Sequence, residues 1–137
     1  MPLSFKTITI PFDIDRTANI IILEVTFQNR DNERRIPMAF DTGASISTIP
    51  AEIALALGCD PSKPKRRVEI IAAGSMEYAP TVLIPCVKFT GFEFKNIEMA
   101  CLNLPPKSSV AGLLGLNVIR NLDILISFSK NELTLRG

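Results

Sequence analysis

The chain has 137 residues, 47% of them hydrophobic and 21% charged, a balance typical of one folded globular domain spanning residues 1–137. Its 15 basic and 14 acidic residues give a formal net charge of +1, which predicts neither nucleic acid nor a membrane surface as a partner. The absence of histidine excludes Ser-His-Asp and Cys-His catalysis and every imidazole-based metal site.

The N-terminal residues 1–6 lack a basic segment followed by a long apolar stretch, so no signal peptide is predicted. The longest compact apolar run, residues 20–23, is strand-sized and too short to cross a membrane. Cys59, Cys86 and Cys101 cannot all pair with one another, and their spacing fits no metal site. We therefore expect a soluble cytoplasmic protein with buried free thiols and with neither a metal nor a cofactor.

Short apolar segments in the first third of the chain, separated by turn signals, predict β-strands. Residues 28–33 are polar and turn-forming, and β-branched residues are frequent before them. Pro37 lacks an N–H group, so we expect a β-bulge or an unpaired edge position there. The strands expected in this part of the chain cover residues 6–10, 20–27 and 35–40.

One helix is expected over residues 51–57, where alanine and leucine favour helix formation. Thr48 is the expected cap, Pro50 suits the first helical position, and Gly58 ends the helix. The following segment, residues 59–67, carries two prolines and four basic residues. It is interpreted as a solvated surface loop, with contact to an acidic partner as the alternative.

The rest of the chain is again β-type, with no tandem repeat and no helix beyond a short turn. A hairpin is expected over residues 68–78, with Gly74 near its tip. The remaining expected elements are strands at residues 82–89, 92–94 and 97–102, an apolar stretch at 110–115, a helical turn at 117–121 and a terminal hairpin of 123–128 with 133–135.

The strongest chemical signal is Ala-Phe-Asp-Thr-Gly-Ala-Ser at residues 39–45. It places the carboxylate of Asp41 between the end of an apolar strand and a tight turn, and Gly43 lets backbone and substrate approach closely. Since the chain has no histidine, a carboxylate is its best candidate catalytic group. Asp-Thr-Gly alone is weak evidence, because aspartate and glycine are ordinary turn residues.

The wider pattern resembles the retropepsin-like aspartic proteases, the family that includes free-standing prokaryotic-type enzymes and protease domains of retroelements. In that family an Asp-Thr-Gly loop is followed by a hairpin that covers the substrate, and then by an apolar-apolar-Gly element beside the catalytic loop. Asp-Thr-Gly at 41–43, the Gly74 hairpin and Leu-Leu-Gly at 113–115 occur here in that order. The resemblance covers nearly the whole chain and implies an all-β, closed barrel of the acid protease fold.

The resemblance also implies roles for individual residues. Ser45 and Leu116 depart from viral relatives, which often carry an acidic residue and an arginine there, so the ion pair that braces those dimers is not expected. The catalytic residue would be Asp41, and its loop would be supported by Thr42, Gly43 and Ala44. Substrate would be bound by Gly43, Ser45, Ala72, Ala73, Gly74 and Ser75. The second element of the ψ-shaped loop would be formed by Leu113, Leu114 and Gly115.

The mechanism of this family needs two carboxylates that share a proton, and the chain carries one Asp-Thr-Gly. The second Asp41 must come from another copy, so the resemblance implies a homodimeric endopeptidase acting on extended polypeptides. Two alternatives stay open from the sequence. One is a non-catalytic dimer that binds extended peptides, and the other is a β-barrel of another class whose Asp41 loop binds a sugar or nucleotide hydroxyl.

Overall fold

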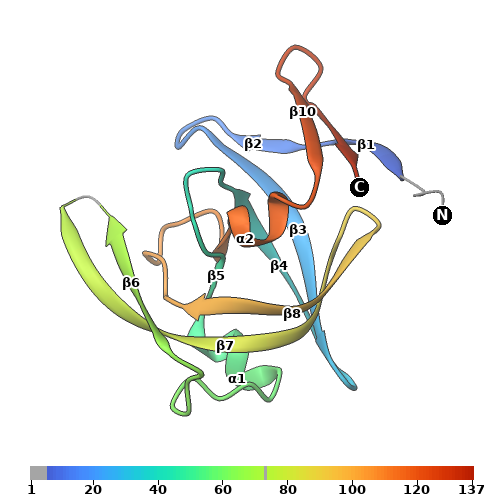
Figure 1. Cartoon of the computed structure of the whole chain (residues 1–137). Coiled ribbons are helices and arrows are strands. Elements are labelled where there is room, and N and C mark those ends of the chain that lie inside the picture. The colour runs from blue at the N-terminus through green and yellow to red at the C-terminus, as the bar shows by residue number, and fades with distance from the viewer. Residues whose placement is uncertain (1–5, 73) are drawn as a thin grey trace.

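The computed structural model describes residues 6–72 and 74–137. Six strands close into a barrel because the first and last of them also pair with each other (Figure 1). This confirms the expected all-β, closed-barrel class. In order around the barrel they are β3 (Ile20–Asn29), β4 (Asn32–Phe40), β9 (Gly112–Leu114), β5 (Thr48–Ile49), β8 (Phe92–Cys101) and β7 (Ser75–Phe89).

Two of these pairings are parallel and join segments far apart in the sequence. β4 runs parallel to β9, with Met38 opposite Gly112, and β5 runs parallel to β8. The short β9 therefore lies between the strand that leads into Asp41 and the strand that leaves the Asp41 loop.

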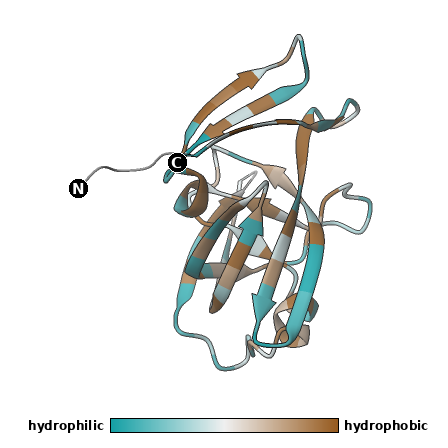
Figure 2. Ribbon diagram, turned by 90° about the vertical axis from the view of Figure 1, so that its right-hand side faces the viewer, coloured by the Kyte–Doolittle hydropathy of each residue, from teal (hydrophilic) through white to brown (hydrophobic). Residues whose placement is uncertain are grey.

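The chain ends form a separate three-stranded sheet at one end of the barrel, of β1 (Thr7–Pro11), β11 (Glu132–Arg136) and β10 (Asp123–Ser127) (Figures 1 and 2). In β11 the side chains of Leu133 and Leu135 are buried, whereas Thr134 between them bonds Thr9 across the strand pair at 2.9 Å. This alternation is the two-residue period of a strand with one buried face. β2 (Asp13–Asp15) extends the barrel sheet beside β3, and β6 (Arg67–Ala72) forms a hairpin with β7.

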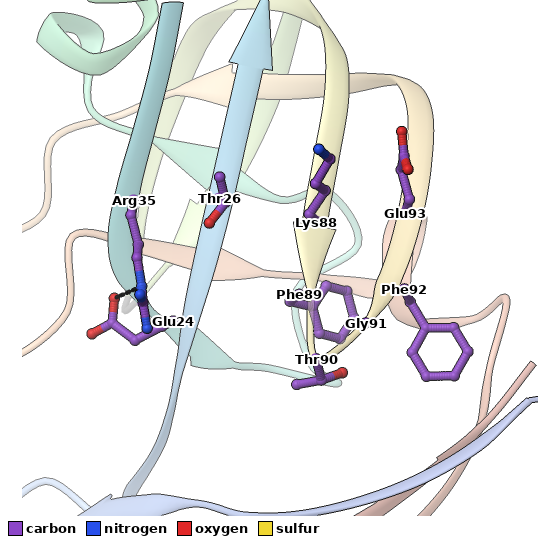
Figure 3. Close-up of a pocket in the computed structure, with 9 residues that line it drawn as sticks. All are labelled: Glu24, Thr26, Arg35, Lys88, Phe89, Thr90, Gly91, Phe92 and Glu93. Carbon is purple, nitrogen blue, oxygen red and sulfur yellow. Dashed lines mark ion pairs between the residues drawn. The ribbon is translucent and has the colours of Figure 1, made fainter.

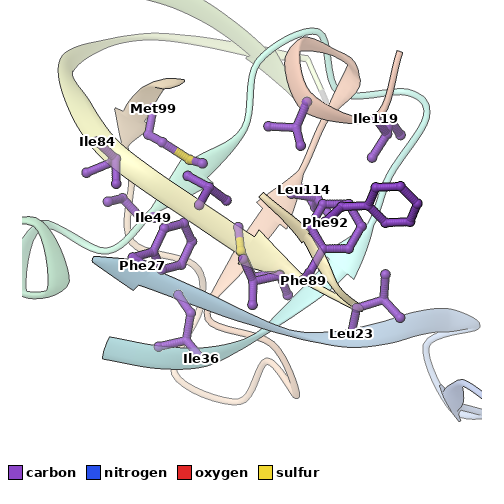
Figure 4. Packing of buried hydrophobic residues seen from close by; sticks show 14 of the residues in the cluster. Leu23, Phe27, Ile36, Ile49, Ile84, Phe89, Phe92, Met99, Leu114 and Ile119 are labelled. Atoms are coloured by element: carbon purple, nitrogen blue, oxygen red, sulfur yellow. The ribbon is translucent and has the colours of Figure 1, made fainter. Parts of the chain in front are cut away.

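The core fills the barrel with apolar side chains from nearly every strand (Figure 4). In β3, Leu23, Val25 and Phe27 are buried while Glu24 is exposed, so one face of the strand meets the core. Met38, Ile84, Met99 and Leu114 are also fully buried. Burial of each such side chain contributes about 1.5–3 kcal/mol.

The helix after the Asp41 loop is α1 (Ala51–Ala56), one residue shorter than expected. Gly58 ends it with φ +77° in the left-handed region, and the N–H of Cys59 reaches back to the carbonyl of Ala54 at 2.8 Å. The expectation that Thr48 caps this helix was wrong, because Thr48 is buried in β5 and Pro50 occupies the N-cap. The second helix, α2 (Leu116–Ile119), confirms the expected short helical turn.

Two expectations about strands were also wrong in detail. No bulge occurs at Pro37, since the β3–β4 register runs without interruption from Ile22–Ala39 to Asn29–Asn32. The carbonyl of Pro37 accepts a bond from Ala111, so its ring nitrogen also faces away from β3 and the missing N–H breaks no β3–β4 bond. The strands expected at 82–89 and in the hairpin join into a single β7, and those at 92–94 and 97–102 into a single β8.

Candidate functional site

Asp41 follows the last residue of β4 and begins the loop that leads to β5. Its backbone N–H donates to the carbonyl of Leu114 in β9 at 3.0 Å, which continues the parallel pairing of the two strands by one bond. Its Oδ1 accepts a bond from the N–H of Gly43 at 2.9 Å, and its carbonyl accepts one from Ala44 at 3.3 Å. The half-buried carboxylate is therefore held at the turn by the backbone of its own tripeptide.

The apolar-apolar-Gly segment lies directly against this loop. The N–H of Leu116 donates to the carbonyl of Ala44 at 2.8 Å. A Cβ atom at Gly115 would lie 2.7 Å from that same carbonyl oxygen, closer than carbon and oxygen can approach. Only glycine allows this contact, which explains why the apolar pair Leu113–Leu114 is followed by glycine.

The side chains of Ser47 and Asn117, which were not predicted as site residues, also hold the loop. Ser47 is completely buried, and its Oγ donates to Oδ1 of Asn117 at 2.8 Å while accepting the N–H of Gly115 at 2.8 Å. The backbone N–H of Ser47 reaches the same Asn117 oxygen at 2.8 Å. Thr48 contributes a fourth bond, because its Oγ1 accepts the N–H of Leu113 at 3.1 Å. A hydroxyl six residues after Asp41 and an amide after Gly115 were the only signals in the sequence for this network.

Asp41 borders two cavities, which share Asp41 and Leu113 in their linings. The first, of about 300 Å³, lies between the loop and the β6–β7 hairpin and is lined by Gly43, Ser45 and Ile70 among others. Its other walls are mostly apolar: Ala44, Ile46, Ile71, Leu102, Leu104 and Leu113, with Thr48 and Glu69. The second, of about 570 Å³, is lined by Asp41 with Ile14, Asn19, Ile20, Ile21, Ala39, Phe40, Leu113 and Phe128.

The β6–β7 hairpin extends from the barrel on the side of the loop that joins β4 to β5 (Figure 1). Ala72 pairs with Ser75, and Gly74 at the turn has φ +82°, a left-handed conformation that favours glycine. Gly74 and Ser75, two of the residues predicted to contact substrate, are exposed at the tip. Ala73, the fourth residue predicted to contact substrate there, lies outside the described residues.

The remaining predicted site residues lie on the exposed side of the loop. Thr42, Gly43 and Ser45 are exposed, whereas Ala44 is half-buried against the start of α2. The structure thus brings Gly43, Ala44 and Ser45 to the same cavity as Asp41. Thr42 does not line that cavity, and its predicted role in supporting the loop stays a prediction.

A further hollow on the outer face of the barrel, which Asp41 does not line, lacks the features of a reactive site (Figure 3). It lies between β3–β4 and the tip of the β7–β8 hairpin. Its charged groups already have partners: Arg35 pairs with Glu24 at 3.5 Å, and Lys88 bonds the side chain of Gln28 at 3.0 Å. The carboxylate of Glu93 pairs with Lys95.

The three cysteines do not offer a second nucleophile. All are free thiols, with Cys86 and Cys101 buried and Cys59 half-buried. Burial raises the pKa of all three, and it raises that of Cys101 to about 11. Because the thiolate is the nucleophilic form, these side chains stay protonated and unreactive near neutral pH. Asp41 is therefore the group at the cavities best suited to chemistry.

A barrel of this topology with a single Asp-Thr-Gly loop at its cavities defines a retropepsin-like protein. A family profile described as Aspartyl protease matches residues 23–118, and the chain belongs to that family. A crystal structure of a retropepsin-like aspartic protease from Rickettsia conorii superposes with a TM-score of 0.69 at 25% identity, covering 97% of this chain and 93% of that chain. No curated protein matches the sequence. The third interpretation, a barrel of another class, is therefore not supported.

Proposed function

We propose that the protein is a homodimeric aspartic endopeptidase in which the two Asp41 carboxylates, one from each subunit, activate a single water molecule. The proposal treats residues 1–137 as one protease domain. The observation that carries it is the position of Asp41, which borders both cavities and is held by Gly43 and Leu114. Membership of the aspartyl protease family supports the same chemistry.

The two carboxylates have complementary tasks in this proposal. Two carboxylates about 3 Å apart cannot both ionise cheaply, so the pair holds one proton, as is established for aspartic proteases as a class. The ionised carboxylate takes a proton from water, whose oxygen attacks the amide carbon. The protonated carboxylate gives its proton to the carbonyl oxygen. The carboxylate that took the proton from water then passes it to the amide nitrogen, and the amine leaves as the C–N bond breaks. The other carboxylate recovers a proton from a hydroxyl of the tetrahedral intermediate as the product carbonyl forms, and the apparent pKa values belong to the pair.

The substrate in this proposal is an extended polypeptide that lies between the Asp41 loop and the β6–β7 hairpin, which acts as a flap. Backbone groups of an extended chain pair with a strand or loop edge, and its alternate side chains enter pockets. Gly43, Ser45, Ala72, Ala73, Gly74 and Ser75 would provide those backbone contacts. The cavity walls of Ile46, Ile70, Leu102, Leu104 and Leu113 favour apolar side chains next to the scissile bond.

Digestion of a peptide library by the wild-type protein and by Asp41→Asn tests the proposal, because this substitution removes the ionisable group at nearly constant shape. Cleavage should fall by about 10³-fold or more in Asp41→Asn. The matched control is Asp31→Asn in the exposed β3–β4 turn, which should cut like the wild type. Equal cleavage by wild type and Asp41→Asn would overturn the proposal.

The alternative, a dimer that binds extended peptides without cutting them, has a distinct outcome in the same experiment. Wild type and Asp41→Asn would then both retain intact peptides with measurable affinity. Family members share the fold whether or not they cut, so only this digestion separates the two functions.

A further inference from the structure

We propose that Glu98 is a positioning residue that joins the base of the β6–β7 hairpin to the Asp41 loop. This inference rests on the proposed function, in which the hairpin closes over a peptide while the loop presents Asp41. Glu98 lies in β8, the strand between the two regions, and takes no part in the chemistry itself.

The side chain of Glu98 holds both strands of the hairpin where they leave the barrel. Its two carboxylate oxygens accept bonds from Nε and a terminal nitrogen of Arg66, each at 2.7 Å. Arg66 immediately precedes β6. Thr81 on β7 is completely buried, and its hydroxyl lies 2.9 Å from a carboxylate oxygen of Glu98 and 3.1 Å from the carbonyl of Arg66.

The same residue reaches the catalytic loop through its backbone. The carbonyl of Glu98 accepts a bond from the side-chain amide nitrogen of Asn117 at 2.8 Å. The amide oxygen of Asn117 receives the N–H and the hydroxyl of Ser47, and Ser47 receives the N–H of Gly115. The residue before Gly115 is Leu114, whose carbonyl binds the N–H of Asp41. Arg66 is therefore connected to the loop by hydrogen bonds that are linked through the body of Glu98 and through the Leu114–Gly115 peptide unit.

The Arg66–Glu98 ion pair differs in geometry from the other ion pairs in the described part of the chain. A bidentate arginine–carboxylate contact fixes orientation as well as distance. The Glu98 side chain is 22% exposed, whereas the carboxylates of Glu24, Glu93 and Asp123 are 50%, 46% and 73% exposed. Surface pairs of the latter kind contribute little to stability and restrain their side chains little.

The two ends of Glu98 should have separable effects on catalysis. Loss of the Glu98 carboxylate loosens the hairpin. Substrate binding must then order the hairpin, and this loss of conformational freedom weakens substrate affinity. Loss of the Asn117 contacts loosens the loop that carries Asp41, which acts on the chemical step. We therefore expect Glu98→Gln to raise KM by about 5-fold with kcat nearly unchanged. Asn117→Ala should instead lower kcat.

The experiment combines steady-state kinetics with amide hydrogen exchange on the protein of residues 1–137. Glu98→Gln and Arg66→Gln should each speed amide exchange in residues 67–81. The double variant should exchange no faster than either single variant, because all three break the same Arg66–Glu98 contact. Arg66 is 61% exposed at its side chain, so Arg66→Gln tests the contact even if Glu98→Gln folds poorly. Glu93→Gln, which removes the pair with Lys95 on the same strand, is the matched control.

Unchanged exchange in both variants, additive effects in the double variant, or equal effects of Glu93→Gln would overturn the role of Glu98. Failure of the proposed function gives a different result. Wild type would then not cut any peptide, while the exchange measurement still decides whether Glu98 holds the hairpin.

Discussion

The hydroxyl of Ser47 is completely buried, and its two bonds join the end of the Asp41 loop to the segment of Gly115 and Asn117. Ser47→Ala would leave the N–H of Gly115 without this acceptor inside the protein. An unsatisfied buried polar group costs about 1–3 kcal/mol, so we expect the free energy of unfolding to fall by that amount. Urea denaturation measures the change. Ser45→Ala, at an exposed position two residues earlier, should have little effect, and equal stabilities of the two variants would contradict this assignment.

At the scale of elements, the base of the β6–β7 hairpin should respond to pH through Glu98. The hydrogen bonds from Arg66, opposed by burial and assisted by Thr81 and by the charges of Arg66 and Lys65, hold the pKa of Glu98 below its ordinary value. The stabilisation is therefore fully present above the unfolded-state pKa of about 4.3 and is lost as pH falls through the lower folded-state pKa.

The glutamine in Glu98→Gln does not titrate. The difference in stability between this variant and the wild type therefore measures how the contribution of the Glu98 carboxylate depends on pH. The wild type should be the more stable protein at neutral pH, and the difference should shrink as pH falls from about 7 to about 3. Denaturant titrations across that range measure it. A difference that stays constant or widens in acid would mean that the ion pair does not stabilise the hairpin base.

The strands show how far local pattern predicts an element. Alternating apolar residues and turn-forming residues identified every strand longer than three residues, because a half-buried strand repeats every two residues. The expected strand at residues 82–89 already ran through Pro85, but the continuity of β7 through Pro80 was missed, since proline normally interrupts a strand. The short β2 and β5 were also missed, because segments of three and two residues are too short to show any period.

For the whole molecule, the proposed dimer makes catalysis depend on protein concentration. Each subunit carries one Asp-Thr-Gly, so a monomer would hold half of the proposed pair. Specific activity should fall when the protein is diluted below the dimer dissociation constant, because mass action then separates the subunits. Activity assays over a dilution series, with sedimentation on the same samples, measure this. A proven monomer with undiminished specific activity would rule out the shared site.

No helix in the described part of the chain is long and apolar enough to cross a membrane. The expectation of a cytoplasmic protein stays a prediction, as does the assignment of catalytic and substrate-binding roles to individual residues.

The longer β-strands, the turn that presents Asp41 and the resemblance to aspartic proteases could be predicted from the sequence. These depend on neighbouring residues, whose spacing is visible in the chain. The position of β9 between β4 and β5, and the contact of Asn117 with Ser47 from 70 residues away, became visible only in the folded barrel. A local pattern shows which face of a strand is buried but not which distant strand or side chain meets it, because that choice depends on packing the whole barrel at once.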